Sequence, residues 1–249
     1  MAKTTELIKQ KIMKKSTMIV FGLLLTFGLQ AQKMDFWLDA GLKVQYGFTS
    51  LFNANATTDG EWDNTLTQGT KYGVKLGFNF NYTGVSLDIL TGTTKGKWQD
   101  IGAVTGPDRE VSVSSTDLYL LFRNARHKGY FELGPKMSFI SDVRDNMDTP
   151  NMEDYYETMN LAGVLGFGTY ILGPEDGRFS GIFGLRFEYG FQDLVNADGR
   201  ALENRQPVPY TGEAATTNPI FAGLVFELNW GIGGVGQARC GERSKFIWF

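Results

Sequence analysis

The chain has 249 residues, with 24 basic and 27 acidic residues and a formal net charge of −3. This balance gives no basic surface of the kind that nucleic-acid binding requires, so we expect no nucleic-acid partner. One Cys excludes an intramolecular disulfide framework and a Cys-rich zinc site, and one His leaves few ways to build a Ser-His nucleophile. We therefore expect no enzymatic activity, no cofactor and no metal site.

Residues 1–31 have the composition of a secretory signal peptide. Five lysines within residues 1–15 precede an apolar run over residues 16–29 and the small residue Ala31. The run is shorter than the about 20 apolar residues that a membrane helix needs. We predict cleavage after Ala31 and export of the remaining chain. The alternatives are a cut near Gln32 and Lys33, or an uncleaved N-terminal anchor.

Beyond the leader, apolar residues recur at every second position, which is typical of strands with two unlike faces. The phase is ambiguous in the fourth and sixth strands, because residues 118–122 are all apolar and residues 161–172 are rich in Gly. In chain order, the expected strands cover residues 36–48, 72–82, 85–89, 111–123, 131–139, 161–172, 183–191 and 220–230.

The segments between these strands also alternate in length. Short turns are expected near residues 83–84, 124–129 and 173–177, and long polar loops near residues 51–69, 92–110, 142–159 and 192–218. Long loops at one end and tight turns at the other are typical of an outer-membrane barrel. We predict an all-β fold, an eight-stranded antiparallel up-and-down transmembrane β-barrel over residues 32–230. Residues 231–249 form a tail of uncertain structure, in which Phe249 could close a further short strand.

The two faces of the strands differ in charge and in glycine content. The apolar face of the clear strands carries no charge, whereas the opposite face mixes both signs with many glycines. Glycine weakens a solvent-facing strand, but inside a narrow barrel it makes room for charged neighbours. Aromatic residues near strand ends, such as Tyr82 and Trp230, suit interfacial girdles. We predict that the apolar face contacts lipid. The alternative is a soluble barrel with its apolar face inward.

A narrow lumen with charges of both signs should contain buried ion pairs, because unpaired buried charge is very costly. We therefore predict a structural charge network and a plugged interior, with solute transport by these charges as the alternative. Lys71 and Asp117 lie on the same face. The predicted network consists of Asp39, Lys43, Lys75, Asp88, Glu132, Lys136, Arg186, Glu188 and Glu227.

Two segments resemble a known family. Residues 115–123 form a Leu-rich strand, followed by a basic turn and an aromatic strand over residues 130–139 that contains Gly134 and Pro135. Residues 184–194 form a second aromatic and Gly-containing strand. Both segments are similar to the PorT-like family of small outer-membrane β-barrel proteins. The resemblance implies a protein without enzymatic activity, in the outer membrane of a Gram-negative bacterium, associated with a secretion or gliding apparatus.

The predicted fold adds further partners: outer-membrane lipid, lipopolysaccharide and the barrel-assembly machinery. We expect a non-enzymatic envelope protein that binds a partner. The alternatives are a small channel or ligand-uptake barrel, and an outer-membrane enzyme.

Few residues suggest any chemistry of their own. His127 lies in a basic turn and is expected to be an exposed turn residue rather than a catalytic base, because no Ser-x-Gly context accompanies it. The acidic segment 142–157 lacks the spacing of an EF-hand and is expected to be a solvated loop, with calcium binding as the alternative. Cys240 is expected to be a free thiol, with an intermolecular disulfide as the alternative.

Overall fold

A computed structural model describes residues 36–53, 62–100, 108–126, 128–146, 152–173, 179–201, 215–236 and 245–248. The predictions for the signal peptide, His127 and Cys240 lie outside these residues. Eight long strands dominate the described part: β1 (Phe36–Asn53), β3 (Thr67–Phe80), β4 (Thr83–Asp100), β5 (Arg109–Arg126), β6 (Gly129–Asp145), β7 (Met159–Leu172), β8 (Phe179–Gly190) and β9 (Thr217–Gly236).

No helix in the described ranges combines the length and the apolar character needed to cross a membrane.

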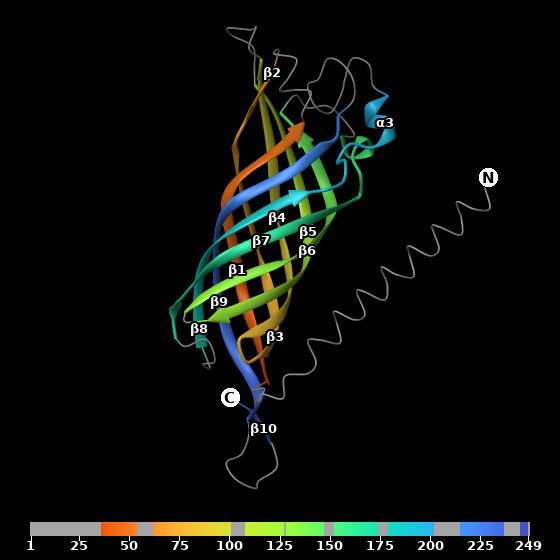
Figure 1. Ribbon diagram of the computed structural model, residues 1–249. Helices are drawn as coiled ribbons and strands as arrows, with labels where there is room; N and C mark the ends of the chain where they lie inside the picture. The colour runs from red at the N-terminus through yellow and green to blue at the C-terminus, as the bar shows by residue number, and fades with distance from the viewer. Residues whose placement is uncertain are drawn as a thin grey trace, which may run out of the picture. The chain divides into compact units, whose positions relative to one another are not determined.

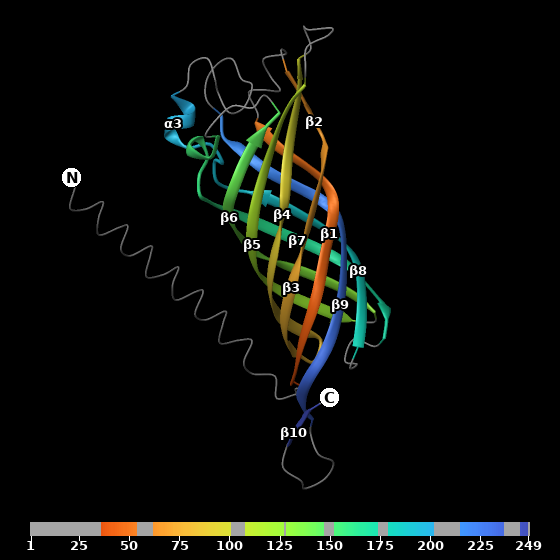
Figure 2. The ribbon, with the colours of Figure 1, turned by 180° about the vertical axis from the view of Figure 1, so that it is seen from behind.

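The long strands close into a ring. Each strand pairs with the next in antiparallel fashion, and β1 pairs with both β3 and β9, so these eight strands leave no open edge along the ring. Figure 1 shows the tilted strands β6 to β9, and Figure 2 shows β1, β3, β4 and β5 from behind. The predicted eight-stranded antiparallel barrel with up-and-down connections is confirmed.

The residue pairings measure how far the strands are staggered. Following paired residues once around the ring from Leu38 leads back to β1 at Phe48, ten residues further along the strand. A stagger of this size over eight strands corresponds to a tilt of about 40° and an interior just wide enough for side chains. The path runs through Phe78, Val85, Phe122, Leu133, Leu165, Phe187 and Ala222.

Every residue on this path is apolar and lies on the outer face, where large side chains such as Leu133 and Phe122 are about half exposed. Aromatic pairs mark the turn end of the band, with ring centroids 5.0 Å apart for Phe36 and Phe80 and 5.6 Å apart for Phe179 and Trp230. The outer face is thus an apolar band with aromatic residues at its rim.

The structure also resolves the two strands whose phase was ambiguous. In β5 the odd-numbered residues point inward, so that Tyr119 and Leu121 are fully buried. In β7 the even-numbered residues point inward, including Ala162 and Val164. The inward positions of both strands are therefore partly apolar, which explains why neither shows a clean alternation.

Four connections differ from the prediction. The segment predicted as a loop over residues 51–69 contains a short strand at residues 62–65, and the flanking strands end at Asn53 and begin at Thr67. The tight turn between β3 and β4 is formed by Asn81, at φ +53°, and Tyr82, whereas Thr83 and Gly84 belong to β4. The predicted loop over residues 92–110 is wrong at both ends, because β4 continues to Asp100 and β5 begins at Arg109. The loop predicted from residue 142 also begins too early, because β6 continues to Asp145.

These extensions form a wall that rises beyond the apolar band on one side of the barrel. We call residues 91–100 of β4, 109–116 of β5 and 140–145 of β6 the projecting wall. A short strand, β2 (Trp62–Thr65), lengthens it by pairing with β4. In this wall the pattern is inverted, because Trp98 and Val113 are buried on the inner face while polar side chains occupy the outer face.

At the opposite end of the barrel, β9 extends six residues past Trp230, to Gly236. A last short strand, β10 (Lys245–Trp248), pairs with this extension. Part of the tail predicted over residues 231–249 is therefore β-strand.

Candidate functional site

Among the described residues, the barrel interior brings together six basic and six acidic side chains, none more than 11% exposed. Their formal charges cancel, so the lumen carries no net charge. The basic residues are Lys43, Lys71, Lys75, Arg123, Lys136 and Arg186, and the acidic residues are Asp39, Asp88, Asp117, Glu132, Glu188 and Glu227.

Six of these side chains form a closed circuit of alternating charge, which we call the six-charge ring. Lys43 bridges Asp88 at 2.5 Å and Glu227 at 2.9 Å. Arg123 bridges Glu227 at 2.8 Å and Glu132 at 2.7 Å. Arg186 completes the circuit by pairing with Glu132 and, at 3.5 Å, with Asp88. Because each member comes from a different strand, the ring ties six strands together across the lumen.

Lys75 and Asp39 extend the six-charge ring toward the turn end of the barrel. Lys75 lies 2.7 Å from Glu227 and 3.1 Å from Asp39. Asn79 donates a hydrogen bond of 2.7 Å to the Asp39 carboxylate. Glu227 therefore contacts three cations and is the most connected group of the interior.

Four further charges form a second closed circuit, the four-charge ring, nearer the loops. Lys71 lies 2.6 Å from Asp117 and 3.3 Å from Glu188. Lys136 lies 2.8 Å from Glu188 and 3.6 Å from Asp117. Each cation thus faces both carboxylates, and each carboxylate faces both cations, which is the arrangement that buried charge requires.

Tyr119 lies between the two rings and contacts both. Its hydroxyl is 2.9 Å from a Glu188 oxygen and 3.2 Å from an Asp117 oxygen, and it can donate to one of them at a time. The centroid of its aromatic ring is 5.1 Å from the Arg186 guanidinium carbon. The Tyr119 side chain therefore fills the space between the six-charge ring and the four-charge ring, and its hydroxyl oxygen has hydrogen-bond partners there.

We expect Tyr119→Phe to lower the free energy of unfolding by about 1.5–3 kcal/mol, because a buried hydrogen bond to a charged acceptor is lost. Urea unfolding in lipid vesicles measures the change. Tyr189→Phe is the matched control, because the Tyr189 side chain lies on the outer face and is 45% exposed. An equal effect of both substitutions would contradict a bridging role for Tyr119.

All nine residues of the predicted network lie in the lumen, seven in or beside the six-charge ring and Lys136 and Glu188 in the four-charge ring. The structure adds Lys71 and Asp117, which the sequence placed on the same face. It also adds Arg123, which the sequence analysis missed because it ends a strand of ambiguous phase.

Glycine on the inner face makes room for this network, as expected from the sequence. At Gly166, a Cβ atom would lie 2.7 Å from both Cγ and Oε1 of Glu132. A side chain at this position would therefore displace Glu132 from its two arginine partners.

We expect Gly166→Ala to destabilise the barrel by about 1–3 kcal/mol, the usual cost of overpacking a filled interior. The control is Gly129→Ala, where the nearest atom to an added Cβ would be 3.6 Å away. Comparing the two urea unfolding midpoints in vesicles tests the expectation, and equal midpoints would contradict it.

Toward the loops, buried side chains form an apolar cluster that we call the mouth cap. The projecting wall and β1 contribute its lower part, and the segments 152–157 and 193–201, which include η1 (Met152–Tyr155) and α3 (Ala197–Arg200), contribute its upper part. Its buried members are Leu51, Trp98, Val111, Val113, Val143, Met152, Tyr156, Leu194 and Val195.

Hydrogen bonds join the two loop segments of the cap to each other. Tyr156 and Val195 form an isolated β-bridge, and the Asn196 side chain donates to the backbone oxygens of Asp154 and Tyr156. Burial raises the pKa of the Tyr156 phenol well above its ordinary value, so this side chain stays neutral. The segments 152–157 and 193–201 are thus joined by hydrogen bonds, and both contribute apolar side chains to the mouth cap.

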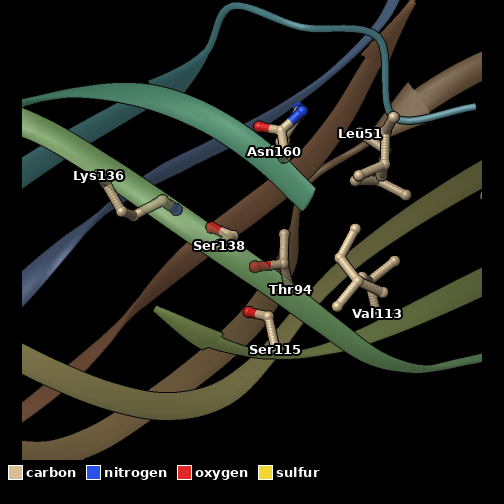
Figure 3. Close-up of a pocket in the computed structure, with 10 residues that line it drawn as sticks. Leu51, Thr94, Val113, Ser115, Lys136, Ser138 and Asn160 are labelled. Carbon is tan, nitrogen blue, oxygen red and sulfur yellow. The ribbon is translucent and has the colours of Figure 1, made fainter. Parts of the chain in front are cut away.

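Between the cap and the four-charge ring lies a cavity of about 20 Å³, enough for one or two water molecules. Figure 3 shows Lys136 and Ser138 toward one side of it and Leu51 and Val113 toward the other. The Asn160 Oδ1 atom borders this space and has no hydrogen-bond partner among the described residues. The site can therefore hold water beside the Asn160 amide oxygen.

No group of three or more His, Cys, Asp or Glu residues is arranged to hold a metal ion within the ranges that the structure describes. The acidic segment predicted as a loop is described only in part, at residues 142–146 and 152–157.

No family model matches the sequence, and no curated protein matches it. The chain resembles small outer-membrane β-barrels. It is similar to the outer membrane protein OprG from Pseudomonas aeruginosa, with 14% identity and a TM-score of 0.37 over 80% of this chain and 96% of that chain. It is also similar to Neisserial surface protein A, with 11% identity and a TM-score of 0.40 over 78% of this chain and 96% of that chain.

A third similar structure is the translocator domain of the autotransporter NalP from Neisseria meningitidis. It shares 10% identity and a TM-score of 0.26 over 89% of this chain and 97% of that chain. None of these likenesses assigns an activity to this chain. Membership of the PorT-like family stays a prediction.

Proposed function

We propose that the protein is a non-enzymatic integral barrel of the outer membrane, with a plugged interior, that acts by binding a partner in the cell envelope. The observation that carries the proposal is the combination of a charge-filled, neutral lumen with an outer face of exposed apolar side chains. A water-soluble barrel would place these two surfaces the other way round.

The exposed band is far larger than a soluble monomer tolerates. Among the described residues, more than 30 large hydrophobic side chains are exposed, and those on the strands lie on the outer face. Soluble monomers rarely expose a contiguous apolar patch above a few hundred Å². Lipid contact satisfies this surface, because strands of 12 to 20 residues exceed the 9–11 that a tilted transmembrane strand needs.

The interior supports a structural rather than a conducting role. An ion crossing the lumen would meet both charge rings, whose members are joined by ion pairs, and then the apolar mouth cap. These barriers favour a closed passage. We therefore assign the charges to stability and propose that the exposed segments at the two ends make the functional contacts.

Planar-bilayer recording tests the plugged state. We expect the inserted barrel to pass no current above that of the bare bilayer, while an open porin under the same conditions shows discrete steps. Reproducible steps from the inserted protein would contradict the proposal and favour the alternative, a small channel or ligand-uptake barrel.

Envelope fractionation followed by affinity purification identifies the partner. The resemblance to PorT-like proteins favours a component of a secretion or gliding apparatus. Recovery of the protein in the soluble periplasmic fraction would contradict the proposed location.

A further inference from the structure

The outer face of the projecting wall changes character step by step with distance from the apolar band. Ile89 is the last apolar outward residue of β4, and Leu118 is the first of β5. Beyond them come outward hydroxyl groups, and beyond these come charges. The hydroxyl residues are Thr91, Thr93, Ser112, Ser114 and Thr116.

The charges form ion pairs between neighbouring strands. Lys95 Nζ lies 2.7 Å from Glu110 Oε1, and Lys97 Nζ lies 2.6 Å from Asp108 Oδ2. We call these four residues the charge ladder. All four side chains are 28–38% exposed, so they remain open to a ligand. Hydrogen bonds from Lys97 and Gln99 lower the pKa of the Asp108 carboxyl, which keeps it charged at neutral pH.

Among the described residues, this surface lies on the side formed by β4 and β5 and is not repeated on β7, β8 and β9. On the side formed by β7, β8 and β9, outward apolar residues continue to the loop ends of the strands, as Met159, Tyr189 and Ile220 show. The hydroxyl positions and the charge ladder therefore form a single continuous patch beside the lipid-facing band.

The distance of the charge ladder from the apolar band, along the barrel axis, favours a lipid with a large headgroup over a phospholipid. At about 3.3 Å per residue and a tilt of about 40°, Lys95 and Lys97 lie roughly 15–20 Å beyond Ile89 along the barrel axis. The headgroup layer of a phospholipid leaflet adds only about 5–8 Å to the hydrocarbon core. A lipid whose headgroup consists of several sugars extends further and presents hydroxyl groups before more distant charges.

We propose that the charge ladder and the hydroxyl positions below it bind a phosphorylated glycolipid of the outer leaflet. The lysines contact phosphate groups, and the carboxylates contact the divalent cations that link neighbouring phosphates. A ladder with equal numbers of both charges suits such a lattice of phosphates and cations. The inference rests on the proposed function, because in an outer-membrane barrel the long loops face the cell exterior and the tight turns face the periplasm.

The test compares two variants in vesicles of neutral phosphatidylcholine, titrated with purified lipopolysaccharide in the presence of Mg²⁺. The ladder variant is Lys95→Gln with Lys97→Gln. The control variant is Arg126→Gln with Lys128→Gln, which removes the same charge from exposed positions at the turn end. The shift of the unfolding midpoint with lipopolysaccharide concentration gives an apparent affinity.

We expect the ladder variant to bind about tenfold more weakly than the wild type, and the control variant to bind unchanged. Each lysine near an anionic membrane surface strengthens binding by roughly fivefold, and the paired carboxylates offset part of this gain. Chelation of Mg²⁺ should weaken binding to the wild type, because the carboxylates lose their cations, and should leave the difference between the variants, because the lysines contact phosphate directly.

Two results would overturn the inference: equal affinity of the ladder and control variants, or equal binding of phosphatidylglycerol and lipopolysaccharide by the wild type. Flotation of the wild type with the neutral vesicles is measured first. Failure to float would reject the proposed membrane location itself, whereas flotation without ladder-dependent binding rejects only the glycolipid site.

Discussion

Glu227→Gln will lower the free energy of unfolding by about 3–5 kcal/mol, because it leaves buried cations without their shared partner. Glu227 lies 2.9 Å from Lys43, 2.7 Å from Lys75 and 2.8 Å from Arg123, and its side chain is fully buried. The amide of Gln keeps the shape of the carboxylate but not its charge. The neutral lumen then carries one excess positive charge that no solvent can screen.

Urea unfolding in lipid vesicles measures this loss, and two further variants show its cause. Adding Lys75→Met to Glu227→Gln makes the lumen neutral again and should recover much of the stability. Glu110→Gln removes the same charge from the partly exposed pair with Lys95, where we expect at most about 1 kcal/mol. If the double variant is less stable than Glu227→Gln alone, excess charge is not the reason for the destabilisation.

The alternation of residue types was sufficient to predict the strand faces where one face was wholly apolar and the other wholly polar. The strand around Lys43 and the strand around Arg186 are examples, and both side chains are fully buried. In β5 the rule fails, because Tyr119 and Leu121 point inward between outward-facing leucines. The lumen needs bulk as well as charge, and a sequence pattern does not distinguish an apolar lumen residue from a lipid-facing one.

The same limitation explains why Arg123 was missed. A single Arg at the end of an apolar strand is equally compatible with a lumen position and with the membrane interface. Its place is decided by Glu132, its direct partner across the β5–β6 hairpin, and by Glu227, which lies 104 residues further along the chain. The hairpin alone brings Arg123 to Glu132, but only the closed ring brings Glu227 to both.

The extent of the strands was underestimated for a related reason. The apolar outward residues of β4 end at Ile89, whereas the strand continues to Asp100 and places Trp98 on its inner face. Beyond the lipid the environment of the outer face changes to polar, while the inner face packs against the mouth cap. The alternation therefore continues with its phase inverted, which is a signal present in the sequence around Val111 and Val113.

An arginine placed on the outer face should lower the free energy of unfolding by an amount that depends on its depth in the bilayer. Leu133→Arg puts a charge in the middle of the apolar band and should cost about 2–4 kcal/mol in a bilayer. Ile171→Arg puts the same charge next to the turn end of β7 and should cost about 0–1 kcal/mol. The two native side chains are 52% and 50% exposed, so exposure alone predicts no difference between them.

The comparison of these two variants in vesicles and in water isolates the contribution of the lipid. In water, half-exposed surface positions tolerate most substitutions within about 0.5 kcal/mol, so both variants should behave like the wild type if the barrel were soluble. A cost that appears at Leu133, is absent at Ile171 and depends on the bilayer has one physical source, the transfer of the guanidinium into hydrocarbon. Equal costs at both positions would reject lipid contact by the outer face, and with it the reason for burying twelve charges in the lumen.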